Sequence, residues 1–79
     1  MKIEHLQYFI VLANSSSISK AAEKLFISQQ QLNRILTALE EEVDAKLLSR
    51  TTNGITLTAD GQDFLTYAQN IVNEYSSLK

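Results

Sequence analysis

Apolar residues near the start of the chain recur with the period of a helix. Over residues 4–14, four of them follow the spacing i, i+3, i+4 and i+7, which places them on one helical face. They are Leu6, Phe9, Ile10 and Ala13. The serine-rich sequence NSSS comes next and is typical of a turn. A short second helix is expected to follow with Ser19 as its N-cap, because a serine hydroxyl accepts a hydrogen bond from the free N–H groups of a first turn.

The clearest helix of the chain begins after Ser28. Ser28 and Gln31 match the capping-box pattern, in which each side chain bonds to the backbone N–H of the other residue. An apolar stripe then repeats at +4, +3 and +4 until the pattern stops at Asp44, and its members are Leu32, Leu36, Leu39 and Val43. On a helical wheel the opposite side is a polar ridge formed by Gln30, Asn33, Arg34 and Thr37. Side chains that contribute nothing to a core therefore occupy the outward face.

The helical pattern then gives way to β-branched residues that alternate around the Asn-Gly pair at 53–54. Asn-Gly between two extended segments is a strong signal for a β-hairpin, which we predict with arms over residues 48–51 and 55–58. Thr58 is expected to be the N-cap of a fourth, longer helix over residues 59–77.

This order of elements predicts a mainly α fold. Residues 1–58 are expected to form a winged helix-turn-helix of three helices and a two-stranded wing, and residues 59–79 a long C-terminal helix. In winged helix-turn-helix modules the last helix of the motif enters the major groove of DNA, and base-contacting side chains project from it. Glutamine and asparagine pair bidentately with adenine, and arginine pairs bidentately with guanine. The polar ridge therefore favours binding to double-stranded DNA.

The last helix carries a second apolar stripe, spaced +4, +3, +4 and +3 as in a coiled coil. Its members are Phe64, Ala68, Ile71, Tyr75 and Leu78. Phe64 comes soon after the wing and suits the small core, but the stripe continues past the reach of residues 1–58. We therefore expect this helix to form a homodimer interface through residues 59–79.

The charge of the chain argues against strong binding to nucleic acid. A chain of 79 residues with 44% hydrophobic and 20% charged residues is ordinary for one small folded domain, but the net charge is −2. Six cations balance six anions over residues 1–58, and residues 59–79 carry the whole negative excess. Because a DNA-binding domain is normally basic, a winged-helix protein-interaction module with little DNA affinity is the alternative interpretation.

The residue types also exclude several kinds of site. The absence of cysteine excludes disulfides and thiolate zinc sites, and it agrees with a cytoplasmic location. No apolar run reaches the ~18 residues that span a membrane. His5 is the only histidine, the serines at 15–17 have no neighbouring base, and two glycines cannot build a phosphate loop. We therefore expect no enzyme activity and no metal or cofactor, and we interpret EEEVD at 40–44 as a solvated helix end.

Several short motifs occur along the chain in a specific order, namely AAEKL, SQ, LE and LTADG. They lie within the longer stretches HLQYFIVLA, SISKAAEKLFISQQQLNRILTALEEE and LLSRTTNGITLTADG. Together these stretches make the chain resemble, over nearly its whole length, the N-terminal DNA-binding domain and linker helix of the bacterial LysR-type transcriptional regulators. The resemblance implies a dimer that reads an interrupted inverted repeat, and a domain downstream of residue 79 that binds a small-molecule effector.

The resemblance also implies roles for individual residues. By position, the base-reading sites of the family correspond to Gln29, Gln30, Asn33 and Arg34. The usual phosphate contacts correspond to Ser28, Thr37 and Arg50, and the wing tip corresponds to Asn53.

The chain departs from the family pattern at four positions that bear on binding. The family usually has proline, serine, glycine and a basic residue where this chain has Gln30, Asn33, Asp44 and Asn53. Because Asn53 removes a cation from the wing tip, we expect weak DNA binding by one copy of this domain and useful affinity only from two linked copies.

Overall fold

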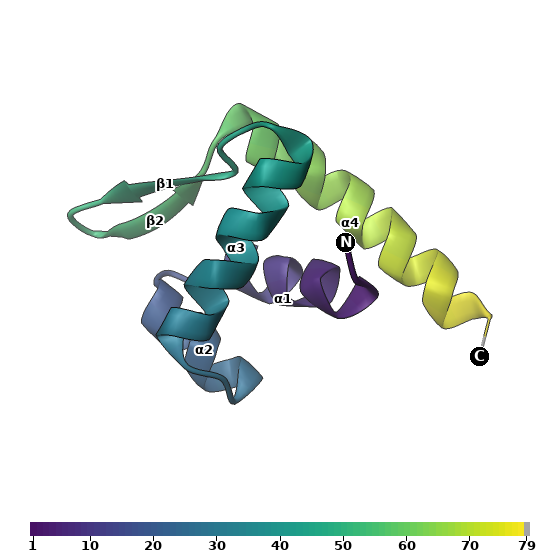
Figure 1. The fold of residues 1–79 in the computed structure, drawn as a ribbon, viewed down its shortest axis with the longest axis horizontal. Coiled ribbons are helices and arrows are strands. Elements are labelled where there is room, and N and C mark those ends of the chain that lie inside the picture. The colour runs from purple at the N-terminus through teal and green to yellow at the C-terminus, as the bar shows by residue number, and fades with distance from the viewer. Residues whose placement is uncertain (79) are drawn as a thin grey trace.

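The computed structural model describes residues 1–78, which form four helices and one β-hairpin (Figure 1). The elements are α1 (Ile3–Ala13), α2 (Ile18–Leu25), α3 (Gln29–Val43), β1 (Leu48–Thr51), β2 (Gly54–Leu57) and α4 (Ala59–Ser77). The predicted winged helix-turn-helix followed by a long helix is therefore confirmed. Each helix within residues 1–78 is too short or too polar to span a bilayer.

The starts of the helices follow from hydroxyl side chains. Ser28 accepts a hydrogen bond from the backbone N–H of Gln31 at 3.0 Å, and Thr58 accepts one from that of Gly61 at 2.9 Å, as predicted for both N-caps. The reciprocal capping-box bond from the Ser28 N–H to the Gln31 side chain does not form within residues 1–78. The prediction for α2 was wrong, because Ser17 and not Ser19 is the N-cap. α2 therefore begins at Ile18, which is buried in the core as its first helical residue.

Two helices end at residues with left-handed backbone conformation. The C-cap of α2 is Phe26 (φ 58°), and the C-cap of α3 is Asp44 (φ 54°), the position where the apolar pattern stops in the sequence. L-amino acids adopt this conformation at some energetic cost, because Cβ approaches the following carbonyl oxygen. At both positions the chain turns sharply into the next connection, so α3 is held at a fixed angle to α2 and to the wing.

The hairpin is antiparallel, with Leu48 opposite Leu57 and Arg50 opposite Ile55. Its second strand begins one residue earlier than predicted, at Gly54, and Thr58 belongs to the cap of α4. A Cβ atom at Gly54 would overlap the carbonyl oxygen of Ser16 in the turn between α1 and α2. This close approach ties the start of β2, next to the turn of the wing, to the helix-turn-helix.

A single core lies between α1, α2, α3, the base of the wing and the first half of α4. Its largest fully buried side chains are Phe9, Leu12, Leu32, Leu39 and Leu47. The rings of Phe9 and Phe64 meet edge to face with centroids 5.0 Å apart, which joins α1 to α4. The wing and the C-terminal half of α4 project from opposite sides of this core (Figure 1).

Candidate nucleic-acid interface

The predicted polar ridge of α3 lies at the surface. Gln30, Arg34 and Thr37 are exposed along one row of the helix, and Gln29 is exposed beside them at the first turn. The apolar residues Leu32, Leu36 and Leu39 of the same helix are buried, so the core fixes which side of α3 faces outward. The outward side is a row of amide, guanidinium and hydroxyl groups about two turns long.

The side chains of Gln29, Gln30 and Arg34 form no hydrogen bond or ion pair within residues 1–78. Their donors and acceptors are therefore available to a ligand. Beside this row lies a shallow open groove lined by Gln30, Asn33, Arg34, Thr37, Ala38 and Glu41. Such a groove offers polar contacts along a helix and no enclosed cavity for a small molecule.

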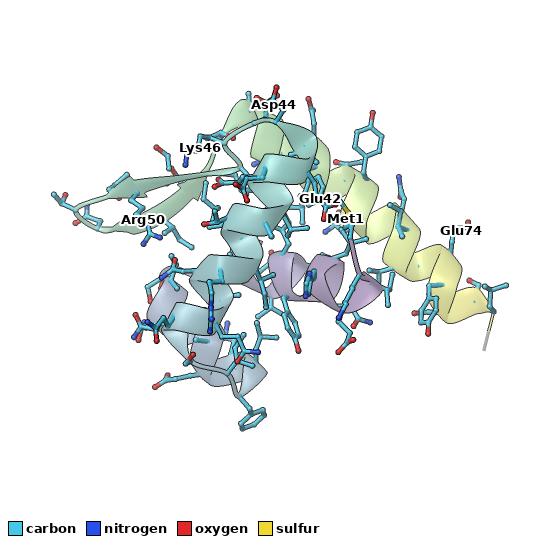
Figure 2. The ribbon with its side chains drawn as sticks, viewed as in Figure 1. Met1, Glu42, Asp44, Lys46, Arg50 and Glu74 are labelled. Carbon is cyan, nitrogen blue, oxygen red and sulfur yellow. The ribbon has the colours of Figure 1, made fainter. Side chains whose placement is uncertain are left out.

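Asn33 differs from the other residues of the ridge because it is half-buried and engaged. Its Oδ1 atom accepts a hydrogen bond of 2.6 Å from Nη2 of Arg50 on β1. The Arg50 side chain projects from the wing on the side that faces α2 and α3 (Figure 2). The structure thus brings together two predicted site residues that lie 17 positions apart in the sequence.

A second open pocket, of about 250 Å³, lies between the wing and the helix-turn-helix. Its lining residues come from the start of α2, the start of α3 and both strands, and are Ser17, Ile18, Gln29, Arg50, Thr51, Gly54 and Ile55. The first backbone N–H groups of a helix attract anions. The guanidinium of Arg50 adds a positive charge to the same place, so this pocket suits a phosphate group.

The wing tip carries no charge. Asn53 is exposed, and its backbone N–H donates to Oγ1 of Thr51 within the turn. The wing is anchored close to its tip, where the N–H of Ile55 donates to the carbonyl oxygen of Ser16 at 3.3 Å. The wing is therefore held at a fixed place beside α3 but offers only an amide at its end.

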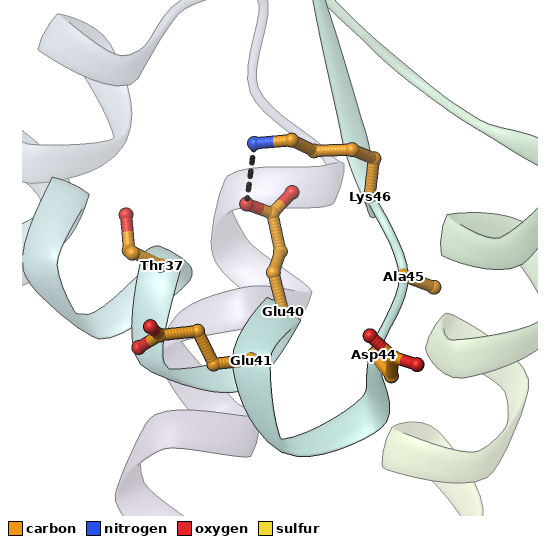
Figure 3. Close-up of a pocket in the computed structure, with 6 residues that line it drawn as sticks. All are labelled: Thr37, Glu40, Glu41, Asp44, Ala45 and Lys46. Carbon is orange, nitrogen blue, oxygen red and sulfur yellow. Dashed lines mark ion pairs between the residues drawn. The ribbon is translucent and has the colours of Figure 1, made fainter.

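Glu40 corrects the interpretation of the acidic segment as a solvated helix end. Only 11% of its side chain is exposed, and its Oε2 atom accepts a hydrogen bond of 2.8 Å from the backbone N–H of the buried Leu47. Its Oε1 atom pairs with Nζ of Lys46 at 3.6 Å (Figure 3). Glu40 therefore joins the end of α3 to the start of the wing, while Glu41, Glu42 and Asp44 remain exposed.

Ion pairing within the chain leaves the cations of the interface available. The anions near the end of α3 pair with groups away from the polar ridge: Glu40 with Lys46, and Glu42 with the terminal amine of Met1 at 3.2 Å (Figure 2). Within residues 1–78 no carboxylate forms an ion pair with Arg34 or Arg50. The balanced charge of residues 1–58 is therefore unevenly distributed, with two arginines on the candidate interface.

The apolar stripe predicted as a dimer interface is divided by the structure. Phe64 and Ala68 are buried in the domain's own core, because they pack against α1 and the base of the wing. Ile71 is 47% exposed and Leu78 is 85% exposed, and Tyr67, which the heptad pattern did not include, is 66% exposed. The surface available to a second copy is therefore the outer half of α4, and the dimer role of Phe64 and Ala68 conflicts with their burial.

The sequence of this chain is similar to that of known bacterial regulators. Residues 3–62 match the family described as "Bacterial regulatory helix-turn-helix protein, lysR family". The chain is 40% identical over 72 residues to the HTH-type transcriptional regulator TfdT of Cupriavidus pinatubonensis, which covers 91% of this chain and 32% of TfdT. It is 35% identical over 78 residues to the regulator BenM of Acinetobacter baylyi, with 99% of this chain and 26% of BenM covered.

Solved structures are similar over nearly the whole chain. A structure of the CbnR DNA-binding domain in complex with DNA has a TM-score of 0.92 at 36% identity and covers 98% of this chain and 88% of that one. The complex of the BenM DNA-binding domain with benA site 1 DNA has a TM-score of 0.91 at 35% identity, with 99% of this chain and 91% of that one covered. The chain thus spans about a third or less of the curated relatives and most of these separate DNA-binding domains.

Proposed function

We propose that this chain, which belongs to the LysR family of bacterial regulatory helix-turn-helix proteins, binds double-stranded DNA in a sequence-specific manner. It would do so as part of a transcriptional regulator. The observation that carries the proposal is the exposed polar row of α3 beside an anchored wing, with Arg34 unpaired within residues 1–78. The solved DNA complexes of the similar CbnR and BenM domains support it. The role is one of binding and not of catalysis.

In this proposal α3 enters the major groove, and its exposed side chains read base edges. Arg34 pairs with guanine through its two parallel N–H donors, and Gln29 and Gln30 pair with adenine through amide oxygen and NH₂. Ser28, Thr37 and Arg50 contact phosphates, which fix the depth and register of α3 without reading sequence. Asn53 approaches the DNA beside the groove that α3 occupies.

A second copy of the chain completes the binding unit. We infer that the exposed apolar residues of α4 pack against the same residues of the partner, which places two copies of α3 in major grooves about one helical turn apart. The predicted target is an interrupted inverted repeat, because a two-fold protein reads a two-fold sequence. A small-molecule effector would act through a domain outside these residues, and the regulator would act in the cytoplasm.

The charge of the chain sets the expected strength of binding. If about three or four cations per copy neutralise phosphates, a dimer makes about six to eight such contacts, and log K falls with log salt by about 0.9 per contact. The acidic end of α3 opposes this attraction. We therefore expect measurable binding at low salt that weakens steeply as salt rises.

Selection from a pool of random duplexes, followed by titration at several salt concentrations, tests the proposal. We expect enrichment of a two-fold sequence. Arg34→Ala should weaken binding to it by ~1–3 kcal/mol and relax the preference at one base pair per half-site. Lys2→Ala is the matched control, because it removes an exposed cation at the far end of α1 and should change affinity little.

The rival function is a winged-helix module that binds another protein. The balanced charge of residues 1–58 and the uncharged wing tip favour it. Under this function the selection enriches no sequence, and the salt dependence is flat because no phosphates are contacted. Either result would remove the DNA-binding proposal.

A further inference from the structure

The side chains of Asn33 and Arg50 form a pair that spans two elements. Asn33 lies in the second turn of α3, and Arg50 lies on β1 opposite Ile55. The hydrogen bond between them is 2.6 Å long and lies at the surface. Because a guanidinium has donors only, the atom of Asn33 that faces it must be the amide oxygen. The orientation of the amide is therefore fixed by chemistry.

This orientation competes with base reading by Asn33. A bidentate contact to adenine requires the amide oxygen to accept from N6 while the amide NH₂ donates to N7. In this chain one of the two lone pairs of that oxygen accepts from Arg50, so the amide oxygen of Asn33 is turned toward β1 of the wing. The side chains of Gln29 and Gln30, by contrast, have no partner within residues 1–78, so they retain both groups for a base.

The same bond leaves Arg50 well placed for a different ligand. One of its five N–H donors is used by Asn33, and the others remain in the rigid planar fork that matches phosphate oxygens. Arg50 also lines the pocket between the wing and the helix-turn-helix, together with Gln29 and the first residues of α2. The bond therefore holds an exposed, flexible side chain at the edge of that pocket.

We propose that Asn33 is a positioning residue that holds the guanidinium of Arg50 at the wing-side pocket for a DNA phosphate, and that Asn33 reads no base. This inference rests on the proposed DNA binding. It replaces the base-reading role that the family resemblance assigns to position 33. Since the chain has only two arginines on the interface, ordering one of them in advance reduces the entropy lost on binding.

A double-mutant cycle tests the inference. The proteins are the unaltered chain, Asn33→Ala, Arg50→Ala and the double variant, each titrated with the selected duplex and with all its single base-pair variants. Asn33→Ala should weaken binding by about 2–12-fold per subunit on every duplex, because each complex then has to order Arg50. Arg50→Ala should weaken binding further and reduce the salt slope by about 1 per subunit. The double variant should bind as Arg50→Ala does.

Two outcomes would overturn the positioning role. If Asn33 reads a base, Asn33→Ala reduces discrimination by about 5–150-fold at one base pair per half-site and leaves the others unchanged. If the pair does not act together, the effects of the two single variants add in the double variant. Either result removes the inference while DNA binding by the unaltered chain stands. A chain that enriches no duplex removes both proposals.

The controls separate positioning from stability. Asn33→Ala and Arg50→Ala alter surface side chains, and alanine favours the helical conformation at position 33, so both variants should fold. Asn73→Ala removes the same side chain from an exposed helical position on α4 and should leave affinity unchanged. Equal thermal midpoints for all variants, with affinity lost only on substitution of Asn33 or Arg50, are the expected result.

Discussion

α3 and α4 are both amphipathic helices that begin at a hydroxyl N-cap, but their apolar stripes are used differently. The buried stripe of α3 runs from Leu32 to Leu39 inside the domain's own core. The stripe of α4 is buried only as far as Ala68, and beyond it Ile71 and Leu78 are exposed. In α3 the side left for a ligand is polar. In α4 the side left for a partner is apolar, and it suits a second copy of the same helix.

The largest effect is expected at the buried part of α4. Phe64→Ala should lower the free energy of unfolding by ~3–5 kcal/mol, because it removes an aromatic side chain from the core and its contact with Phe9. Urea denaturation at low protein concentration measures this change. Tyr67→Ala, one turn away and 66% exposed, should change stability by less than ~0.5 kcal/mol. Equal losses in the free energy of unfolding for both variants would contradict the division of α4 into a buried and an exposed part.

The next effect is expected at the end of α3. Glu40→Ala should lower the free energy of unfolding by ~1–3 kcal/mol, because it leaves the backbone N–H of the buried Leu47 without its acceptor. Glu41→Ala is the matched control, since this neighbouring glutamate is exposed and should have little effect. If the two variants unfold at the same urea concentration, Glu40 is not the link between α3 and the wing.

A smaller effect is expected at the exposed part of α4. There a substitution should change the association of two copies and not the stability of the fold. Ile71→Ala should weaken the dimer by about 1 kcal/mol, roughly fivefold, because about half of the Ile71 side chain is still available for burial. Sedimentation equilibrium over a range of concentrations measures the dissociation constant. Gln69→Ala, on the opposite side of α4, should leave it unchanged. An unaltered chain that stays monomeric at high micromolar concentration would exclude this interface.

The smallest effect is expected where α3 ends in a left-handed residue. Asp44→Gly should raise the free energy of unfolding by about 0.5 kcal/mol, because glycine adopts the φ of 54° without strain and this gain exceeds its larger entropy loss on folding. Asp60→Gly, in the first turn of α4, should lower stability instead, because a right-handed helical position gains nothing from glycine. Thermal melts of the two variants show directly whether each substitution raises or lowers stability.

Features that depend on neighbours within one or two turns were predictable. The bounds of α4, the caps at Ser28 and Thr58, and the end of α3 at Asp44 all follow from hydroxyl placement and apolar period. The start of α2 was not predictable, because the turn before it contains several adjacent serines that could each serve as the N-cap. The structure uses Ser17 and buries Ile18 directly after it, and that burial depends on residues far away in the chain.

The candidate site also has features that the sequence predicts and features that it does not. The exposed row of α3 was predictable, because the helical period alone places Arg34 and Gln30 on the side of the helix opposite the buried leucines. The hydrogen bond between Asn33 and Arg50 and the one between Glu40 and Leu47 were not predictable. Arg50 and Leu47 both lie beyond the end of α3 in the chain. A sequence pattern gave Asn33 the same outward position as Arg34, although one is engaged and the other free.

By itself, the sequence determined which segments are helical, where most of them begin and end, and which side of each is apolar, since hydrogen bonds within a turn and the spacing of side chains set these properties. The tertiary structure alone decided which apolar side is covered and which polar groups are already paired. Phe64 and Ile71 have the same place in a heptad, yet Phe64 is buried against Phe9 of α1 and Ile71 is 47% exposed. The reason is physical: burial and pairing require that elements distant in the chain converge in space, and a local pattern carries no information on how far the core extends.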